Sequence, residues 1–129
     1  MLKVLIADDE EKICQLIIKL INWEEMGLKI AATASNGIEA LEQAKICKPE
    51  ILITDIRMPG IDGMELIRKV KEKLPDTEII IISGYRHFEY AQTAIRYGVR
   101  NYLLKPIKKE ELRDTLQKIA DIYREKMNS

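Results

Sequence analysis

Aromatic residues, cysteine and histidine are all scarce in this sequence. Phe, Trp and Tyr together make up 5% of its 129 residues, and there are two cysteines and one histidine. Cys14 and Cys47 do not have the spacing of a metal site, and we expect both to be reduced thiols packed within helical segments. His87 stands alone, which favours a solvated loop residue over a phosphoryl carrier or a metal ligand.

Net charge and long apolar runs are also absent. Basic and acidic residues both number 21, which argues against nucleic-acid binding by this chain alone. No run reaches the roughly 20 apolar residues that a membrane span needs. Acidic residues at positions 8–11 directly follow the apolar start of the chain, which argues against a signal peptide. We therefore expect a cytoplasmic protein that has no contact with a membrane.

Short apolar runs recur along the chain, at a length that fits one domain. Several are rich in Ile and Val, and they do not alternate with polar residues, which is typical of strands buried on both faces. The predicted strands are residues 3–7, 28–34, 51–54, 78–82 and 101–104.

Between these runs lie five patterns with the spacing of helices that bury one face. The predicted buried stripes are Ile13, Leu16, Ile17, Leu20 and Ile21; Ile38, Leu41 and Ala44; Leu66, Ile67, Val70 and Leu74; Ala91, Ala94 and Ile95; and Leu112, Leu116, Ile119, Ala120 and Tyr123. Ser35 or Asn36 would cap the second helix. Alternating strands and helices predict an α/β fold with a parallel sheet covered on both faces.

Polar residues follow four of the predicted strands. Asp8 and Asp9 follow the first strand, Asp55 the third, Ser83 the fourth and Lys105 the fifth. Ligands of open parallel sheets bind beyond the carboxyl ends of the strands. If the strand order is 2-1-3-4-5, which the alternation of strands and helices does not determine, the first and third strands are neighbours. The three aspartates would then meet in one pocket with Ser83 and Lys105 on its other side.

These residue types fit phosphoryl transfer to a carboxylate. Three carboxylates close together repel one another, and a cation would relieve that repulsion. Mg²⁺ prefers oxygen ligands, and it would neutralise a phosphoryl group and align it for attack by a carboxylate. Lys105 would supply a positive charge to one phosphoryl oxygen and Ser83 a hydroxyl donor to another.

Other interpretations of the same residues are weaker. The acidic run at 8–11 alone would fit the first turn of a helix, where the dipole favours negative charge. A phosphatase with an aspartyl-phosphate intermediate usually has a second acid two residues after the nucleophile, where this chain has Arg57. A flavin or nucleotide carrier would have a glycine- or serine-rich phosphate loop after the first strand, where this chain has acids.

Four segments carry a family resemblance, namely residues 5–10, 52–60, 82–84 and 102–106. They resemble the signature of the receiver domain of two-component response regulators, in that family's order and near its spacing. The resemblance extends from Lys3 to about Tyr123. It implies a doubly wound, flavodoxin-like fold with a five-stranded parallel sheet of order 2-1-3-4-5 and five helices. The whole chain, residues 1–129, would be one receiver domain with a core at about 3–123.

The resemblance also implies a metal site. Asp55 would be the phosphoryl acceptor. Asp9 and Asp55 would bind Mg²⁺ directly, and Asp8 would bind it mainly through water. The main-chain carbonyl of Arg57 would provide a further ligand.

A switch is implied on the other side of the pocket. Ser83 and Tyr102 would form the switch pair, and Lys105 would bind the phosphoryl group. The bond between Lys105 and Pro106 is cis in the family, and we expect it to be cis here.

The resemblance implies a phosphorylation switch and not a turnover enzyme. A separate sensor histidine kinase would donate the phosphoryl group, and the domain would slowly dephosphorylate itself. Residues 21–27 and 83–91 resemble the Gram-positive regulators whose receivers precede an AraC-type helix-turn-helix domain. DNA would then be bound only through an output domain that this chain does not contain. The alternative is a stand-alone receiver that acts through protein–protein interaction.

Aromatic residues crowd into one region, where Tyr85, Phe88, Tyr90, Tyr97 and Tyr102 make up five of the chain's seven. They fit either ordinary packing or an interaction face. We expect phosphorylation to promote a symmetric homodimer through the helix around 91–95, the strand at 101–104 and the helix around 112–123.

Overall fold

The computed structural model describes residues 1–84, 88–99 and 101–128. His87, Tyr85 and Arg100 lie outside the described residues, and so do the side chains of Phe88, Tyr90 and Ala91. The elements in chain order are β1 (Leu2–Ala7), α1 (Glu11–Leu20), the 3₁₀ helix η1 (Glu24–Met26), β2 (Leu28–Ala34), α2 (Gly37–Cys47), β3 (Ile51–Thr54), α3 (Gly63–Lys73), β4 (Glu78–Ser83), α4 (Phe88–Arg96), β5 (Asn101–Leu104) and α5 (Lys109–Asn128).

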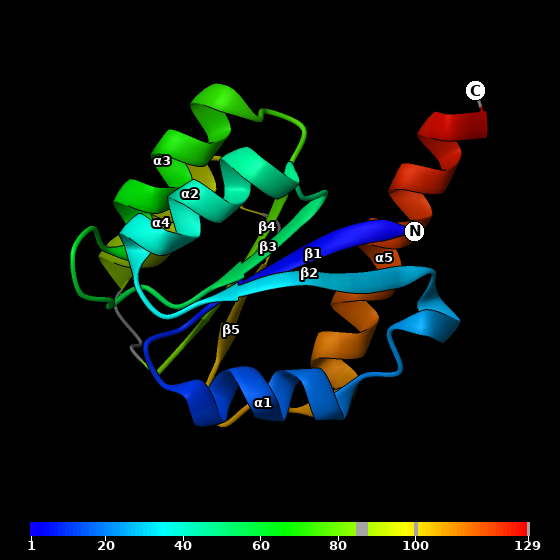
Figure 1. The fold of residues 1–129 in the computed structure, drawn as a ribbon, viewed down its shortest axis with the longest axis horizontal. Helices are drawn as coiled ribbons and strands as arrows, with labels where there is room; N and C mark the ends of the chain where they lie inside the picture. The colour runs from blue at the N-terminus through cyan, green and yellow to red at the C-terminus, as the bar shows by residue number, and fades with distance from the viewer. Residues whose placement is uncertain (85–87, 100, 129) are drawn as a thin grey trace.

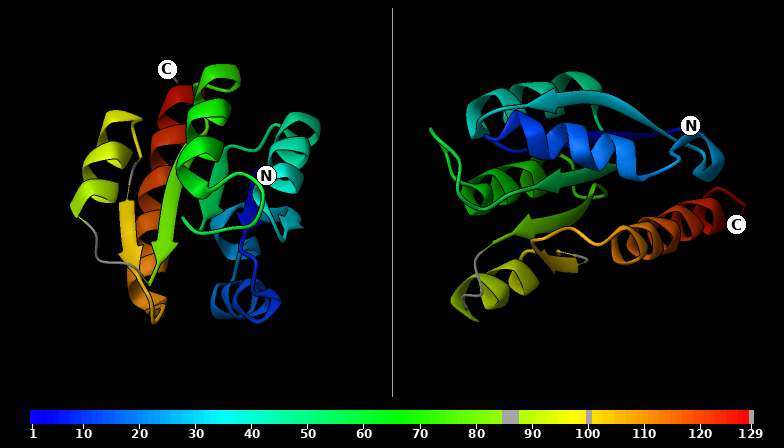
Figure 2. Two further views of the ribbon diagram at one scale, coloured as in Figure 1. Left: turned by 90° about the vertical axis from the view of Figure 1, so that its left-hand side faces the viewer. Right: turned by 90° about the horizontal axis from the view of Figure 1, so that it is seen from below.

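The strands form one parallel sheet with the order β2-β1-β3-β4-β5, which confirms the predicted topology. Helices α1 and α5 cover one face of the sheet, and α2, α3 and α4 cover the other (Figures 1 and 2). None of the helices in the described part of the chain is long and apolar enough to cross a membrane.

The continuous apolar runs arise because the central strands are buried on both faces. In β4, Ile80 and Ile82 pack with the α1 and α5 side chains, while Ile79 and Ile81 pack with those of α2, α3 and α4. Each fully buried isoleucine stabilises the fold by about 1.5–3 kcal/mol relative to an exposed one. The predicted strands agree with the observed ones to within one residue at each end.

The predicted stripes of α1 and α2 are partly wrong. Leu16 is 41% exposed and Ile38 is 54% exposed, so neither belongs to the buried face. In α1 the buried residues include Cys14, and in α2 they are small residues such as Ala40 and Ala44. Leu41 also packs against the core cluster that contains these alanines, while Ile38 and Ile46 are exposed.

The other helices follow the prediction more closely. The stripes of α3 and α5 are buried or half-buried throughout. In α4, Ala94 is buried, but Ile95 is 74% exposed and was wrongly placed in the core. Asn36, one of the two predicted caps, accepts a hydrogen bond from the main-chain N–H of Glu39 at 2.8 Å.

The connection from α1 to β2 contains η1 and is anchored by Trp23. The Trp23 indole N–H donates to the carbonyl oxygen of Ile18 at 3.0 Å, and the ring is buried. Cys14 and Cys47 are free thiols, buried and half-buried respectively, and both lie in helices.

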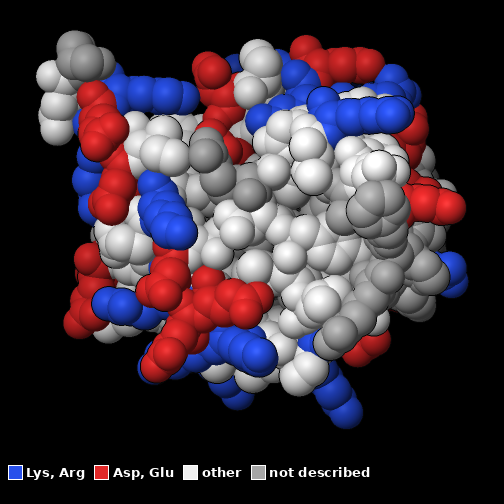
Figure 3. Space-filling model, turned by 180° about the vertical axis from the view of Figure 1, so that it is seen from behind, with Lys and Arg blue, Asp and Glu red and all other residues white. Residues whose placement is uncertain are grey.

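An uncharged band crosses the face seen in Figure 3, which carries α4, β5 and α5. Basic and acidic side chains surround this band. In α4, the turn after it and β5, the described apolar residues that are not fully buried include the exposed Ile95 and the half-buried Tyr97, Val99 and Tyr102.

Candidate functional site

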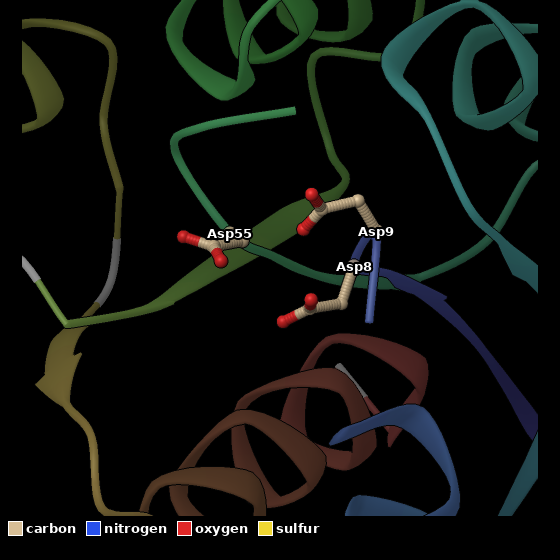
Figure 4. A group of neighbouring side chains, drawn as sticks. All are labelled: Asp8, Asp9 and Asp55. Atoms are coloured by element: carbon tan, nitrogen blue, oxygen red, sulfur yellow. The ribbon is translucent and has the colours of Figure 1, made fainter. Parts of the chain in front are cut away.

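Three aspartates meet at the carboxyl ends of two neighbouring strands. Asp8 and Asp9 directly follow β1, and Asp55 directly follows β3. The strands pair in parallel, and the main-chain N–H of Asp55 donates to the carbonyl oxygen of Ala7 at 3.1 Å. One carboxylate oxygen of each aspartate lies within 4.8 Å of the others. Figure 4 shows all three carboxylates on the same side of these strand ends.

The three aspartates differ in their exposure to solvent. Asp8 is 3% exposed and Asp55 is 6% exposed, while Asp9 is exposed. Burial raises the pKa of Asp8, and the charge of Asp55 adds to this effect. The main-chain N–H of Glu10, which donates to Asp8 Oδ1 at 2.9 Å, and the nearby Lys105 oppose the rise in pKa.

Lys105 connects the two buried carboxylates. Its Nζ lies 2.9 Å from Asp55 Oδ2 and 3.2 Å from Asp8 Oδ2. Burial lowers the pKa of Lys105, but the hydrogen bond and the charge of Asp55, together with those of Asp8, raise the pKa overall. Lys105 is therefore held in its charged form and offsets one of the three carboxylates, which leaves negative charge for a metal cation to balance.

Ser83 and Tyr102 lie on the neighbouring strands β4 and β5. Ser83 is the last residue of β4 and is fully buried. Its carbonyl oxygen accepts a hydrogen bond from the main-chain N–H of Lys105 at 2.8 Å, which fixes the end of β5. Tyr102 pairs with Ile81 and is half-buried. The bond from Lys105 to Pro106 is cis, as the resemblance implied.

A pocket of about 430 Å³ opens above the aspartates. Its lining residues are Asp9, Glu10, Asp55, Arg57, Gly84 and Lys105. Within the described residues, the structure thus brings together the acidic residues, Arg57 and Lys105 that the sequence singled out. Buried Asp8 and Ser83 are not part of the lining.

The Asp55 carboxylate is held in place by backbone contacts that the sequence did not reveal. The main-chain N–H of Ile56 donates to Asp55 Oδ1 at 2.6 Å. The N–H of Gly63 donates to the carbonyl oxygen of Ile56, also at 2.6 Å. A Cβ at Gly63 would lie 2.1 Å from the carbonyl oxygen of Asp55, so only glycine fits there. The Asp-Gly pair at 62–63, a helix cap followed by glycine, was the available signal.

The side chains at this site can bind a cation and an anion side by side. Buried and exposed carboxylate oxygens close together are the ligands that a hard divalent cation such as Mg²⁺ prefers. Asp55 borders the open pocket and is a carboxylate that can act as a nucleophile. Lys105 lies where it can contact an anion bound to Asp55.

A family model for the response regulator receiver domain matches residues 4–117. The chain belongs to the receiver domain family of two-component response regulators. The sequence resemblance is thereby confirmed.

Relatives agree with this family in sequence and in fold. The transcriptional regulatory protein YesN of Bacillus subtilis is 43% identical over 126 residues, which cover 97% of this chain and 34% of YesN. A response regulatory protein of Staphylococcus epidermidis is 38% identical over 129 residues, 100% of this chain and 51% of that protein. The receiver domain of AraT from Geobacillus stearothermophilus has a TM-score of 0.92 and 41% identity, covering 98% of both chains. This receiver domain thus spans a third to a half of the length of the two curated relatives.

Proposed function

We propose that this receiver domain is a phosphorylation switch in which Asp55 accepts a phosphoryl group in the presence of Mg²⁺. The observation that carries the proposal is the convergence of Asp8, Asp9 and Asp55, with the Lys105 ammonium 2.9 Å from Asp55. The domain is a switch and not a turnover enzyme, because Arg57 stands where a phosphatase of this chemistry would have its second acid.

Mg²⁺ would be held mainly by Asp9 and Asp55. Asp9 is exposed and free to turn toward an ion, and Asp55 borders the same pocket. Asp8 is already engaged by Glu10 N–H and by Lys105, which suits a ligand that acts through water. The main-chain carbonyl of Arg57 would complete the protein ligands. A bound Mg²⁺ would supply positive charge that offsets the charge of the incoming phosphoryl group.

In the transfer, a carboxylate oxygen of Asp55 attacks phosphorus and forms the new P–O bond. The P–N bond to the phosphohistidine of the donor kinase breaks, and the imidazole leaves with the bonding electrons and takes a proton from solvent. Lys105 would move its contact from the two carboxylates to a phosphoryl oxygen, because the phosphoryl group adds about −1.5 to −2 charge at neutral pH.

The conformational response would pass through Ser83 and Tyr102. A shift from mostly inactive to mostly active requires about 5.5 kcal/mol of differential stabilisation. A charge-assisted hydrogen bond from the Ser83 hydroxyl would supply about 1.5–3 kcal/mol. The remainder would come from Lys105, from inward rotation of Tyr102 and from contacts between protomers.

The protomer contacts would form on the α4-β5-α5 face. Figure 3 shows an uncharged band on this face. The half-buried aromatic residues Tyr97 and Tyr102 lie directly after α4 and in β5. Aromatic side chains are enriched in interface cores. Exposed charges of both signs lie on or directly beside these elements, so each patch can meet its opposite across a two-fold axis. These exposed residues are Glu89, Arg96, Lys108, Lys109, Glu110, Glu111 and Asp114.

The partners would be a sensor histidine kinase and, through an output domain, DNA. YesN is named a transcriptional regulatory protein, and this chain covers 34% of it, so YesN contains other segments that could bind DNA. The balanced charge of this chain gives no basis for DNA binding by the receiver itself. These partners would place the protein in the cytoplasm. A stand-alone receiver that acts through protein contacts is the alternative, and the full-length gene sequence would decide between them.

A small-molecule phosphodonor tests the proposal directly. Incubation with acetyl phosphate and Mg²⁺ should add the mass of one phosphoryl group to the intact protein. Chelation of the metal by EDTA should prevent this addition. A protein that gains no phosphoryl mass with Mg²⁺ present would overturn the proposed function.

A further inference from the structure

We propose that the β2–α2 turn, residues 34–38, sets the geometry of the aspartate site although none of its side chains lines the pocket. Gly37 is the main positioning residue of this turn. The inference rests on the proposed function, because it assigns the turn a role in holding the atoms that bind Mg²⁺.

The start of the turn, at Ala34, is hydrogen-bonded to the backbone of Asp8, which directly follows β1. The main-chain N–H of Asp8 donates to the carbonyl oxygen of Ala34 at 3.0 Å, directly after the paired residues Ala7 and Ala34. Asp8 and Asp9 therefore leave the sheet in a direction that β2 helps to fix.

The other end of the turn lies against the β3–α3 loop, residues 55–62. The main-chain N–H of Gly37 points to the carbonyl oxygen of Pro59 at 3.4 Å. A Cβ at Gly37 would lie 2.0 Å from the carbonyl oxygen of Ile61 and 2.9 Å from its carbonyl carbon. These are main-chain atoms, so no rotation of a side chain could relieve the overlap. Either the loop or the start of α2 would have to move.

Ile38 makes the next contact with the same loop. Its Cδ1 lies 3.1 Å from the position of a Cβ at Gly60, a residue whose φ of +84° favours glycine. Ile38 is 54% exposed, yet it covers this glycine. The sequence prediction placed Ile38 in the sheet core, and the structure shows it on the loop.

The loop held by these contacts carries the β3 side of the site. It begins at Asp55, contains Arg57, and is fixed at its far end by the Gly63 N–H. The turn itself is held by the Asn36 cap, with a Ser35 hydroxyl bond to Glu39 at 3.0 Å beside it. Residues 34–38 thus connect the backbone at Asp8 to the backbone after Arg57, and they fix the spacing between the two sources of ligands.

A pair of isoleucine variants on one helix tests this role. Ile38→Ala removes the contact with Gly60, while Ile46→Ala removes a side chain that is 74% exposed at the far end of α2. Loss of a group that orients metal ligands typically weakens metal affinity by about 10–100-fold. We expect the Mg²⁺ dissociation constant of Ile38→Ala to be about tenfold higher than that of the wild type. The dissociation constant of Ile46→Ala should equal the wild-type value.

Amide hydrogen exchange without Mg²⁺ gives a second readout of the same pair. Exchange at the amides of residues 57–63, apart from Pro59, which has no N–H, should be faster in Ile38→Ala than in Ile46→Ala, because only the former loosens the loop. Equal Mg²⁺ affinities and equal loop exchange in the two variants would overturn the role of the turn.

Gly37→Ala tests the closest contact, with Gly98→Ala as its control. Gly98 has a φ of +76°, so alanine strains the backbone there too, but at the turn that follows α4. Both variants should lower the melting temperature, while only Gly37→Ala should weaken Mg²⁺ binding, by about tenfold or more. If Gly37→Ala does not fold, the isoleucine pair decides.

The two proposals fail in different ways. A wild-type domain that binds no Mg²⁺ and accepts no phosphoryl group would overturn the proposed function. A wild-type domain that does both, together with an Ile38→Ala variant indistinguishable from Ile46→Ala, would overturn only the positioning role of the turn.

Discussion

The ammonium group of Lys105 lies 2.9 Å from a carboxylate oxygen of Asp55. Asp55 directly follows β3 and Lys105 directly follows β5, two strands that do not pair with each other. β4 separates β3 from β5 in the sheet, so the contact spans the width of one strand. Asp55 is thus held by a cation on one oxygen and by the Ile56 N–H on the other. The carboxylate is therefore oriented before a donor or metal binds, and this reduces the entropy that must be lost to position it during phosphoryl transfer.

Asp55→Asn should abolish labelling by acetyl phosphate. The substitution keeps the shape of the side chain but replaces the nucleophilic carboxylate with an amide. Intact mass spectrometry should show no added phosphoryl group under conditions that label the wild type. Asp62→Asn is the matched control, because Asp62 is an exposed cap of α3, where asparagine caps equally well. Phosphoryl mass appearing on Asp55→Asn at the wild-type rate would show that the acceptor lies elsewhere.

Asp9→Ala should weaken Mg²⁺ binding by at least about tenfold, the usual order for loss of a group that shapes a metal site. Asp9 is the exposed member of the aspartate cluster and is free to reach an ion. Calorimetric titration with Mg²⁺ measures the effect. Glu11→Ala removes an exposed negative charge nearby that does not line the pocket, and it should bind Mg²⁺ like the wild type. Equal losses in both variants would reduce the role of Asp9 to general charge.

Asp8→Asn should stabilise the metal-free domain at neutral pH while it weakens Mg²⁺ binding. The folded-state pKa of Asp8 is raised above its ordinary value of 3.8, chiefly by burial, so the folded state holds this proton more tightly than the unfolded state does. Stability from this group is therefore present below that ordinary value and is lost as the pH rises through the folded-state pKa. Asparagine does not ionise, so the variant avoids this loss of stability at neutral pH. Thermal unfolding at several pH values should show the gain above the folded-state pKa and its disappearance in acid.

Lys105→Ala should uncouple phosphorylation from the conformational response more than it blocks phosphorylation. Asp55 and the metal perform the transfer, whereas Lys105 is placed to sense the phosphoryl oxygens. Amide NMR spectra with and without beryllofluoride, a mimic of the phosphoryl group, should show much smaller shifts in β4 and β5 than in the wild type. Lys108→Ala, an exposed lysine in the same segment, should respond normally. Wild-type shifts in Lys105→Ala would contradict this role.

The same Lys105 variant should be less stable without metal. Removing the ammonium leaves buried carboxylate oxygens of Asp8 and Asp55 without their partner, a loss of about 1–3 kcal/mol at neutral pH. Urea unfolding measures this difference. Added Mg²⁺ should recover part of the lost stability, because the ion replaces the missing positive charge.

The strands and their order could be predicted from the sequence to different degrees. β4 is buried on both faces, so residues 79–82 form a continuous apolar run whose ends are easy to find in the sequence. The predicted bounds of this strand, residues 78–82, were therefore correct to within one residue. Alternation of strands and helices gave a parallel sheet but not its order, which came from the family resemblance. The meeting of Asp8 with Asp55 depends on that order, because these residues follow β1 and β3, which are neighbours in the sheet.

Close approaches between distant segments could not be predicted. Ile38 fits a helical stripe as well as Ala40 does, and only the packing of α2 against the β3–α3 loop decides which of them faces the sheet. Gly37 and Gly63 have no side chain whose chemistry would draw attention. At both positions a main-chain oxygen of another segment lies only 2.0–2.1 Å from the place that a Cβ would occupy. A pattern of residue types contains no information on such contacts between distant segments.

Beryllofluoride should convert the domain from monomer to dimer through the α4-β5-α5 face. Each exposed charge pair at the rim contributes only about 0–1 kcal/mol, so the charges would set the register while the uncharged band supplies affinity. We expect Tyr97→Ala to abolish the dimer, because it removes a half-buried aromatic ring directly after α4, and aromatic residues are enriched among those that dominate binding at interfaces. Arg96→Glu should weaken the dimer without abolishing it. Arg100, which directly precedes β5 in the sequence, lies outside the described residues.

Sedimentation velocity at about 100 μM protein, where even complexes with micromolar dissociation constants are populated, measures the dimer. Leu16→Ala is the matched control, because Leu16 is an exposed apolar residue of α1, and α1 lies away from α4 and β5 (Figure 2, left). It should dimerise like the wild type. A wild-type domain that stays monomeric with beryllofluoride would refute the dimer. A dimer that survives Tyr97→Ala but not Leu16→Ala would place the interface on the α1 side, and the switch would then have to act through a different face.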